Sequence, residues 1–243
     1  MIKLSYDLHI HSCLSPCADD DMTPANIAGM AYVKGLDVIA LTDHCSARNC
    51  PALMQAAKEY GITVIPGMEV CTSEEIHVVC LFPDLKSALD ASADVYAHLP
   101  NITGGKGLFG NQLVMDEFDN VIESVKRPLW LPTTISFSEL FALVEDSLGV
   151  FIPAHIDRPS ASVLSQLGFV PPGSRFTCTE VGDVSNLPLL LAKHDYLRGC
   201  NIISSSDAHS LWQMNEAVNH IEAESRKLPD IFNALTNRSQ PKK

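Results

Sequence analysis

Histidine and acidic residues recur in this sequence directly after short apolar runs. Five polar segments follow such runs, namely DLHIH (7–11), TDH (42–44), GME (67–69), PAH (153–155) and SDAH (206–209). The runs are rich in β-branched residues and bounded by turn residues, which is typical of buried parallel strands. Because the carboxyl ends of parallel strands meet on one side of a sheet or barrel, we expect these polar residues to lie together. Imidazoles combined with carboxylates favour divalent zinc, manganese or iron.

The first of these segments contains a closely spaced histidine pair, His9 and His11. Side chains two positions apart on a strand point to the same side, so this pair could bind one ion together. A single histidine is more often an ordinary surface or core residue than a ligand. The combination of the pair with four further polar strand ends favours a metal site over that interpretation.

The first half of the sequence alternates strands and helices. The expected elements are strand 2–8, helix 24–34 with Thr23 as N-cap and Pro24 at its first position, strand 36–41, helix 51–60 and strand 62–66. This order predicts parallel strands joined by right-handed crossovers. The next strand, 76–82, follows Glu69 too closely for a crossover helix, so its direction can differ from that of its neighbours.

The second half is regular except over residues 99–135, which we interpret as an insertion or lid over the site. There GGKGLFG (104–110) resembles a mobile loop and VMDEFDNVIESV (114–125) an amphipathic helix. The other expected elements are helix 84–98, helix 137–148 with a capping box from Ser136 and Glu139, strand 150–154, helix 160–167, strand 176–181, helix 187–194, strand 201–205 and helix 229–237. We expect a single α/β domain over 1–237 and a disordered tail at 238–243.

Composition limits the possible location and partners of the protein. No apolar stretch approaches the roughly 20 residues that span a bilayer, and the N-terminus lacks a signal-peptide pattern. The eight cysteines are dispersed, which fits a reducing compartment, so we expect a cytoplasmic protein without a membrane partner. The formal net charge of −12 argues against a broad nucleic-acid-binding surface. It allows a small phosphorylated substrate, because bound divalent ions would reverse the local field.

The order of the motifs along the chain resembles that of a known family. D-x-H-x-H, T-D-H, G-x-E, two further histidines and D-x-H follow one another from Asp7 to His209. This set is similar to that of the polymerase and histidinol phosphatase (PHP) family of metal-dependent phosphoesterases. The resemblance implies a distorted (β/α)7 TIM-like barrel with the metal site at the C-terminal ends of its strands.

The resemblance also implies which residues bind two to three divalent ions of zinc, manganese or iron. The implied ligands are His9, His11, Glu69 and Asp207 for the first ion, Glu69, His77 and His155 for the second, and His44 and His209 for the third. Asp7 and Asp43 would orient neighbouring imidazoles.

One position departs from the family pattern. The family usually supplies a histidine or aspartate to the third ion several residues after the H-x-H pair, and this register falls on Cys17. A thiolate there would favour zinc or iron over magnesium. The alternatives are that Asp19 or Asp20 takes this place, or that the third ion is weakly bound.

A separate site of four thiolates is a further alternative. Its ligands would be Cys13, Cys17, Cys45 and Cys50, although their spacing differs from the common C-x2-C form.

The implied reaction is hydrolysis of a phosphoester by a metal-activated hydroxide. The substrate would be a small phosphomonoester or a nucleotide-type compound. Arg158 and, less directly, Arg48 follow the strand ends and could bind its phosphate, because guanidinium binds phosphate through two hydrogen bonds. Asp207 or His209 could protonate the leaving oxygen. The alternatives are an amidohydrolase-like hydrolase of C–N or C–O bonds, which would use the same chemistry, and a non-catalytic metal-binding regulatory module.

Overall fold

The structure, a computed structural model, describes residues 1–102 and 110–236. Its main sheet has the order β10-β1-β2-β3-β4-β7. The strands are β1 (Ile2–Ile10), β2 (Val38–Leu41), β3 (Thr63–Cys71), β4 (His77–Leu81), β7 (Val150–Pro153) and β10 (His220–Ala223). As predicted, β1, β2 and β3 are parallel. The strand β4 is antiparallel to β3, because no crossover helix separates the two, and it is also antiparallel to β7.

A second pair of parallel strands, β8 (Cys178–Glu180) and β9 (Asn201–Ile203), lies beside the main sheet. Hydrogen bonds connect β8 to the residues after β7, where the Ile156 N–H donates to the Glu180 carbonyl over 2.8 Å. On the other side, the His11 N–H donates to the Ala208 carbonyl over 2.9 Å, which joins the residues after β9 to β1. The sheet is therefore curled, and the predicted α/β class is confirmed.

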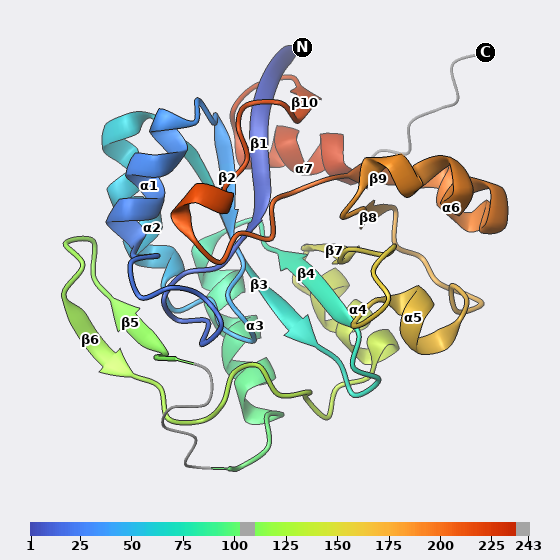
Figure 1. The fold of residues 1–243 in the computed structure, drawn as a ribbon, viewed down its shortest axis with the longest axis horizontal. Coiled ribbons are helices and arrows are strands. Elements are labelled where there is room, and N and C mark those ends of the chain that lie inside the picture. The colour runs from blue at the N-terminus through green and yellow to red at the C-terminus, as the bar shows by residue number, and fades with distance from the viewer. Residues whose placement is uncertain (103–109, 237–243) are drawn as a thin grey trace.

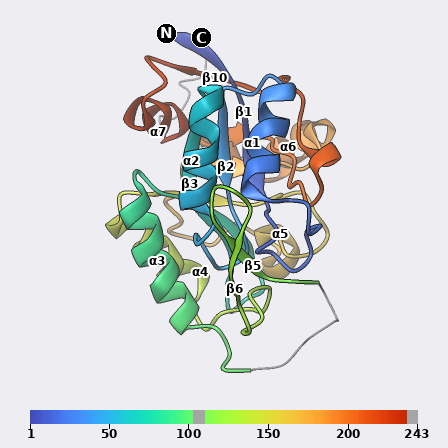
Figure 2. The ribbon, with the colours of Figure 1, turned by 90° about the vertical axis from the view of Figure 1, so that its left-hand side faces the viewer.

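Helices surround the curled sheet, and the last of them lies at the N-terminal end of β1 (Figures 1 and 2). They are α1 (Pro24–Val33), α2 (Cys50–Ala56), α3 (Leu85–Ala97), α4 (Phe137–Asp146), α5 (Val163–Leu167), α6 (Leu187–Lys193) and α7 (Leu228–Thr236). The predicted caps are present, since the Thr23 hydroxyl accepts from the Asn26 N–H and Ser136 forms a capping box with Glu139. None of the helices in the described ranges is long and apolar enough to cross a membrane.

Alternate residues of the strands belong to two apolar clusters. On β2, Val38 and Ala40 belong to an inner cluster, and Ile39 and Leu41 to an outer cluster that includes residues of α1 and α2. The helix α7 contributes to the inner cluster and lies near the N-terminal end of β1 (Figure 1). The opposite end of the strands is the end where the polar residues were predicted to gather.

The prediction of a helix over 114–125 is wrong. This segment forms a β-hairpin of β5 (Leu113–Met115) and β6 (Val121–Ser124), and its turn contains Asp119 with a positive φ of 61°. The Asp119 carboxylate accepts hydrogen bonds from the Thr23 hydroxyl and the Ala25 N–H, which attaches the turn to the start of α1. These tertiary contacts override the helical periodicity of the segment.

Two other predicted segments lie largely or wholly outside the described residues. They are the loop 104–110, of which only Gly110 is described, and the tail 238–243.

Candidate metal centre

Four ligand-type side chains meet at the C-terminal end of β1. The Nε2 atoms of His9 and His11 lie 3.2 Å apart. The Nε2 atom of His9 lies 3.3 Å from Oε1 of Glu69 and 3.3 Å from Oδ1 of Asp207. The Nε2 atom of His11 lies 3.4 Å from Oε2 of Glu69 and 3.2 Å from the same Asp207 oxygen. Four ligands at roughly 2.0–2.1 Å from a tetrahedral zinc ion lie about 3.3–3.4 Å from one another. These spacings therefore match those of a metal-binding cluster.

The hydrogen bonds on the far side of both imidazoles determine their tautomers. His9 Nδ1 lies 3.0 Å from Oε2 of Glu180, and His11 Nδ1 lies 2.9 Å from the Ser15 hydroxyl. The Ser15 hydroxyl donates its proton to Asp43 over 2.7 Å, so it accepts from His11. When both rings are neutral, as metal ligation requires, Nδ1 of each is therefore the protonated nitrogen, and both Nε2 lone pairs point toward the same carboxylates. Without a cation, burial opposes a charge on His9, but the carboxylates Glu180, Asp207 and Glu69 outweigh it and raise the pKa of His9 well above its usual value, so a proton would take the place of the metal charge.

A second cluster is built around the same glutamate. Oε1 of Glu69 lies 2.9 Å from His77 Nδ1 and 3.4 Å from His155 Nε2. Glu69 and His155 are buried, whereas the His77 side chain is 22% exposed. Because Glu69 belongs to both clusters, it has the position of a bridging ligand. Gly67 contributes to this placement, since a Cβ there would lie 2.7 Å from the Cys80 carbonyl of the neighbouring β4.

A third cluster contains His44, His209 and His11, which together could bind an ion. Cys17 lies close enough to His209 and His44 for both rings to affect its thiol. Burial raises the pKa of the Cys17 thiol, but the interactions with both rings outweigh it and lower the pKa to about 7. Cys17 is therefore a neighbour of this cluster, whereas the group of mutually close ligand atoms consists of His11, His44 and His209.

The charges of these groups are strongly coupled. Burial alone would raise the pKa of Glu69, but the neighbouring His77 and His9 hold it well below its usual range. Burial lowers the pKa of His11 to about 3, so its ring is neutral, as a metal ligand requires. Burial also opposes the charge on His44, but hydrogen bonds with Cys17 and Glu69 raise its pKa to about 10.

The two aspartates predicted to orient imidazoles act through intermediate groups. Asp43 accepts from the Ser15 hydroxyl, which in turn binds His11. Asp7 accepts hydrogen bonds from the backbone N–H groups of Ser206 and Asn215, at 2.9 and 3.0 Å. Asp7 therefore secures the loop that carries Asp207, whose φ of 52° is in the left-handed region. Such strain persists only where the surrounding contacts maintain it.

The two predicted phosphate-binding arginines differ in position. Nη1 of Arg158 donates to Oδ2 of Asp207 over 2.6 Å, so Arg158 lies at the edge of the first cluster, with 43% of its side chain exposed. Arg48 instead forms a two-point ion pair with Glu123 of β6. The structure therefore brings Arg158, but not Arg48, into contact with a predicted ligand.

Sequence reasoning missed Glu180 and Ser15, which both contact the H-x-H pair. Glu180 is the last residue of β8 and follows the apolar run that we predicted as strand 176–181. The same rule that identified the other polar strand ends therefore applied to it. Ser15 carries no such signal, because it lies in a loop.

The alternative site of four thiolates receives no support. The groups of three or more potential ligands in the described ranges consist of histidine and glutamate. Cys13, Cys45 and Cys50 are buried free thiols, and burial raises the pKa of each to about 12.

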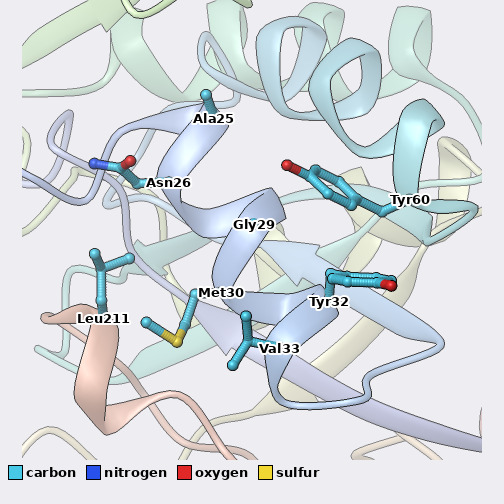
Figure 3. Close-up of a pocket in the computed structure, with 8 residues that line it drawn as sticks. All are labelled: Ala25, Asn26, Gly29, Met30, Tyr32, Val33, Tyr60 and Leu211. Atoms are coloured by element: carbon cyan, nitrogen blue, oxygen red, sulfur yellow. The ribbon is translucent and has the colours of Figure 1, made fainter.

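A hollow of about 550 Å³ lies on the outer face of α1, between this helix, Tyr60 and Leu211 (Figure 3). It contains none of the predicted ligands, so it is separate from the metal centre.

Comparison with known proteins identifies the family. The PHP domain model matches residues 7–146, and a PHP-associated model matches residues 197–239. The first match covers more than half of the chain, so the chain belongs to the PHP domain family.

Relatives with curated names include two nucleases. A 5′-3′ exoribonuclease of Haemophilus influenzae is 40% identical over 79 residues, which are 31% of this chain and 28% of the relative. A 5′-3′ exoribonuclease of Salmonella typhimurium is 33% identical over 85 residues, which are 33% of this chain and 28% of the relative. These matches thus span less than a third of the relatives' length.

Among solved structures, the lesion-specific endonuclease Q of Pyrococcus furiosus has a similar fold. The TM-score is 0.72 at 20% identity, over 97% of this chain and 56% of the endonuclease. An endonuclease Q has also been solved in complex with a 27-mer duplex substrate that carries an abasic lesion, and its TM-score is likewise 0.72 at 20% identity.

These comparisons correct one prediction. We expected a small phosphorylated substrate and no broad nucleic-acid-binding surface, but two relatives are named exoribonucleases and a protein of similar fold is named an endonuclease. The error arose because the formal net charge of −12 describes the whole molecule, whereas recognition of a phosphate depends on the local field at the site.

Proposed function

We propose that this protein is a metal-dependent nuclease that hydrolyses phosphodiester bonds of RNA or DNA. The observation that carries the proposal is the convergence of Glu69 and Asp207 on the His9–His11 pair. The two Nε2 atoms lie 3.2 Å apart, and each lies 3.2 to 3.4 Å from an oxygen of both carboxylates. Membership of the PHP family and the names of the relatives support it.

Two or three ions fit the three clusters. We propose these ligand sets: His9, His11, Glu69 and Asp207; Glu69, His77 and His155; and Cys17, His44 and His209. The fit is supported by a buried polar atom that has no hydrogen-bond partner within the described residues, Asp207 Oδ1, which faces the Nε2 atoms of His9 and His11. Such atoms are costly unless a ligand binds them. Imidazole and carboxylate suit zinc, manganese or iron, and the Cys17 thiolate would favour zinc or iron.

Bound ions would activate water and neutralise the charge that develops on the phosphoryl oxygens. The chain itself then has to orient the substrate. Arg158 is partly exposed and already held beside Asp207, so its guanidinium can contact a non-bridging phosphate oxygen at the edge of the first cluster. Asp207 and His209 remain the candidates for proton donation to the leaving oxygen, although metal ligation competes with this role.

The negative net charge is compatible with this substrate. Each ion would bring two positive charges to the site, so the phosphodiester would meet a positive local field. A negative surface elsewhere disfavours unspecific binding along a long polyanion. We therefore expect contacts with few nucleotides around the scissile bond.

We also propose the finer architecture that the family resemblance implies. The strands β1, β2, β3, β4, β7, β8 and β9 would be the seven strands of a distorted barrel, consistent with the hydrogen bonds from Ile156 to Glu180 and from His11 to Ala208. Residues 1–237 would form one domain, with 99–135 covering the site. The Arg48–Glu123 ion pair, which holds β6 beside the loop after His44, supports this placement.

The test is cleavage of single-stranded and duplex RNA and DNA oligonucleotides labelled at either end. The assay uses the metal-depleted protein with added zinc, manganese or iron. We expect shortened products only with metal, and far less product from Glu69→Gln. The direction of shortening distinguishes attack from one end from internal cleavage. Absence of cleavage for every oligonucleotide and metal would refute the proposed function.

A further inference from the structure

Glu180 is a buried carboxylate that contacts two of the proposed ligand residues. It is 2% exposed at the end of β8. Its Oε2 atom accepts from His9 Nδ1–H over 3.0 Å and from the backbone N–H of His155 over 3.1 Å. Its other oxygen, Oε1, has no hydrogen-bond partner within the described part of the chain. A buried carboxylate with a free oxygen is costly, so its retention calls for a compensating role.

We propose that Glu180 is a positioning residue for the metal centre, an inference that rests on the proposed function. By accepting the Nδ1 proton, Glu180 fixes the tautomer of His9 and directs the Nε2 lone pair toward Glu69 and Asp207. By accepting from the backbone of His155, the same oxygen sets the second cluster relative to the first. His155 has a φ of 29°, and the bond to Glu180 is one contact that holds this strained backbone.

The two imidazoles of the H-x-H pair are oriented differently. His11 donates to the neutral hydroxyl of Ser15, and the Asp43 carboxylate lies one step further away. His9 donates directly to a carboxylate. A carboxylate in direct contact makes an imidazole a stronger ligand, because it stabilises positive charge on the ring. His9 should therefore contribute more to metal affinity than His11, and this difference should depend on Glu180.

A purely structural role for Glu180 is the competing explanation, because Glu180 also joins β8 to the residues after β7. Asp157 provides a matched control, since it joins the same two segments without contacting an imidazole. Its carboxylate accepts from the N–H groups of Gly182 and Asp183 at 2.7 and 2.9 Å, and from the Asn186 amide at 2.9 Å.

The experiment compares zinc affinity, measured by competition with a chromophoric chelator, in wild type, Glu180→Gln, Glu180→Asp and Asp157→Asn. We expect Glu180→Gln to weaken the tightest site by about 10–100-fold, as loss of a group behind a ligand histidine does. Glu180→Asp keeps the charge and should recover part of the loss. Asp157→Asn should remain within about threefold of wild type, as expected for a group that does not touch a ligand histidine.

A spectroscopic readout separates positioning from structure. In zinc-loaded wild type with 15N-labelled histidine, the His9 ring, assigned by its loss in His9→Gln, should be protonated at Nδ1. Protonation at Nε2, or equal zinc affinities of wild type and Glu180→Gln, would overturn the inference while leaving the proposed function intact. Equal losses in Glu180→Gln and Asp157→Asn would also overturn it. A wild type that binds no zinc would instead refute the metal centre itself, and this inference with it.

Discussion

Two aspartates at opposite ends of β2 show how the two ends of the curled sheet differ. Asp37 directly precedes the strand and accepts from the Ser5 N–H over 2.9 Å and from Arg226 over 2.7 Å. Asp43 follows the strand, is fully buried, and accepts from the Ser12 N–H and from two hydroxyls. The pKa of Asp37 is lowered, whereas burial raises the pKa of Asp43.

The difference indicates what each end does. At the N-terminal end, a cationic side chain of the chain itself balances the carboxylate, as expected of a region that supports stability. At the C-terminal end, carboxylates and imidazoles gather and Arg158 reaches only the edge of the cluster. The charge there is balanced by protons or by ions that come from outside the chain. The proposed function and the contacts that support stability therefore lie at opposite ends of the same strands.

The largest effect should come from Glu69, which lies within 3.4 Å of five imidazoles. Glu69→Gln keeps the volume but removes the shared charge, so we expect hydrolysis of a labelled oligonucleotide to fall by about 10²–10³-fold or more. His9→Ala should act in the same direction. Asp37→Asn, at the opposite end, serves as the control with unchanged turnover. Near-normal turnover of Glu69→Gln would mean that the centre lies elsewhere.

Metal removal should have the next largest effect, and it should act through the C-terminal end alone. A ligand that binds only the folded state at 100 times its Kd stabilises that state by about 2.7 kcal/mol. We therefore expect thermal unfolding of the metal-depleted protein to begin at a lower temperature, and added zinc or manganese to reverse the shift. Glu69→Gln should respond much less to added metal. Coincident melting curves of wild type with and without chelator would contradict a resident metal centre.

The sequence predicted this end of the molecule better than the surrounding architecture. Most of the proposed ligand positions were identifiable because they lie at or after the end of a strand, and strand ends are local features; His77 instead begins β4. The hairpin β5–β6 could not be identified from the sequence. Its residues Val121 and Ile122 are apolar yet exposed, and the apolar residues of this segment recur at the spacing of a helical stripe. The strand β10 was missed because only its pairing with β1 makes it a strand. Elements determined by tertiary contacts leave little local signal.

Cys17 should give a smaller, site-specific effect. Its thiol has a lowered pKa of about 7 and is exposed, so the metal-depleted protein should react with iodoacetamide at this residue near neutral pH. Added zinc should protect it if the thiolate is a ligand. Peptide mapping by mass spectrometry measures both states, with buried Cys50 as the unreactive reference. Equal labelling of Cys17 with and without zinc would assign the third ion to His11, His44 and His209 or to a neighbouring aspartate.

The smallest effect should come from Asp37, and it should change stability without changing activity. Partial burial would raise the pKa of Asp37, but hydrogen bonds from Ser5 and the charge of Arg226 outweigh it and lower the pKa. A carboxylate with a lowered pKa in the folded state stabilises the protein at pH values above the pKa of the same group in the unfolded chain. This contribution is lost as the pH falls through the pKa of the folded state.

Asp37→Asn should therefore cost about 1–2 kcal/mol of unfolding free energy near pH 7, because it weakens charged hydrogen bonds at a partly exposed site. The difference from wild type should shrink steadily below about pH 4. Urea unfolding at several pH values measures this trend, and a difference that grows toward acid pH would show that the charge of Asp37 does not stabilise this end of the sheet.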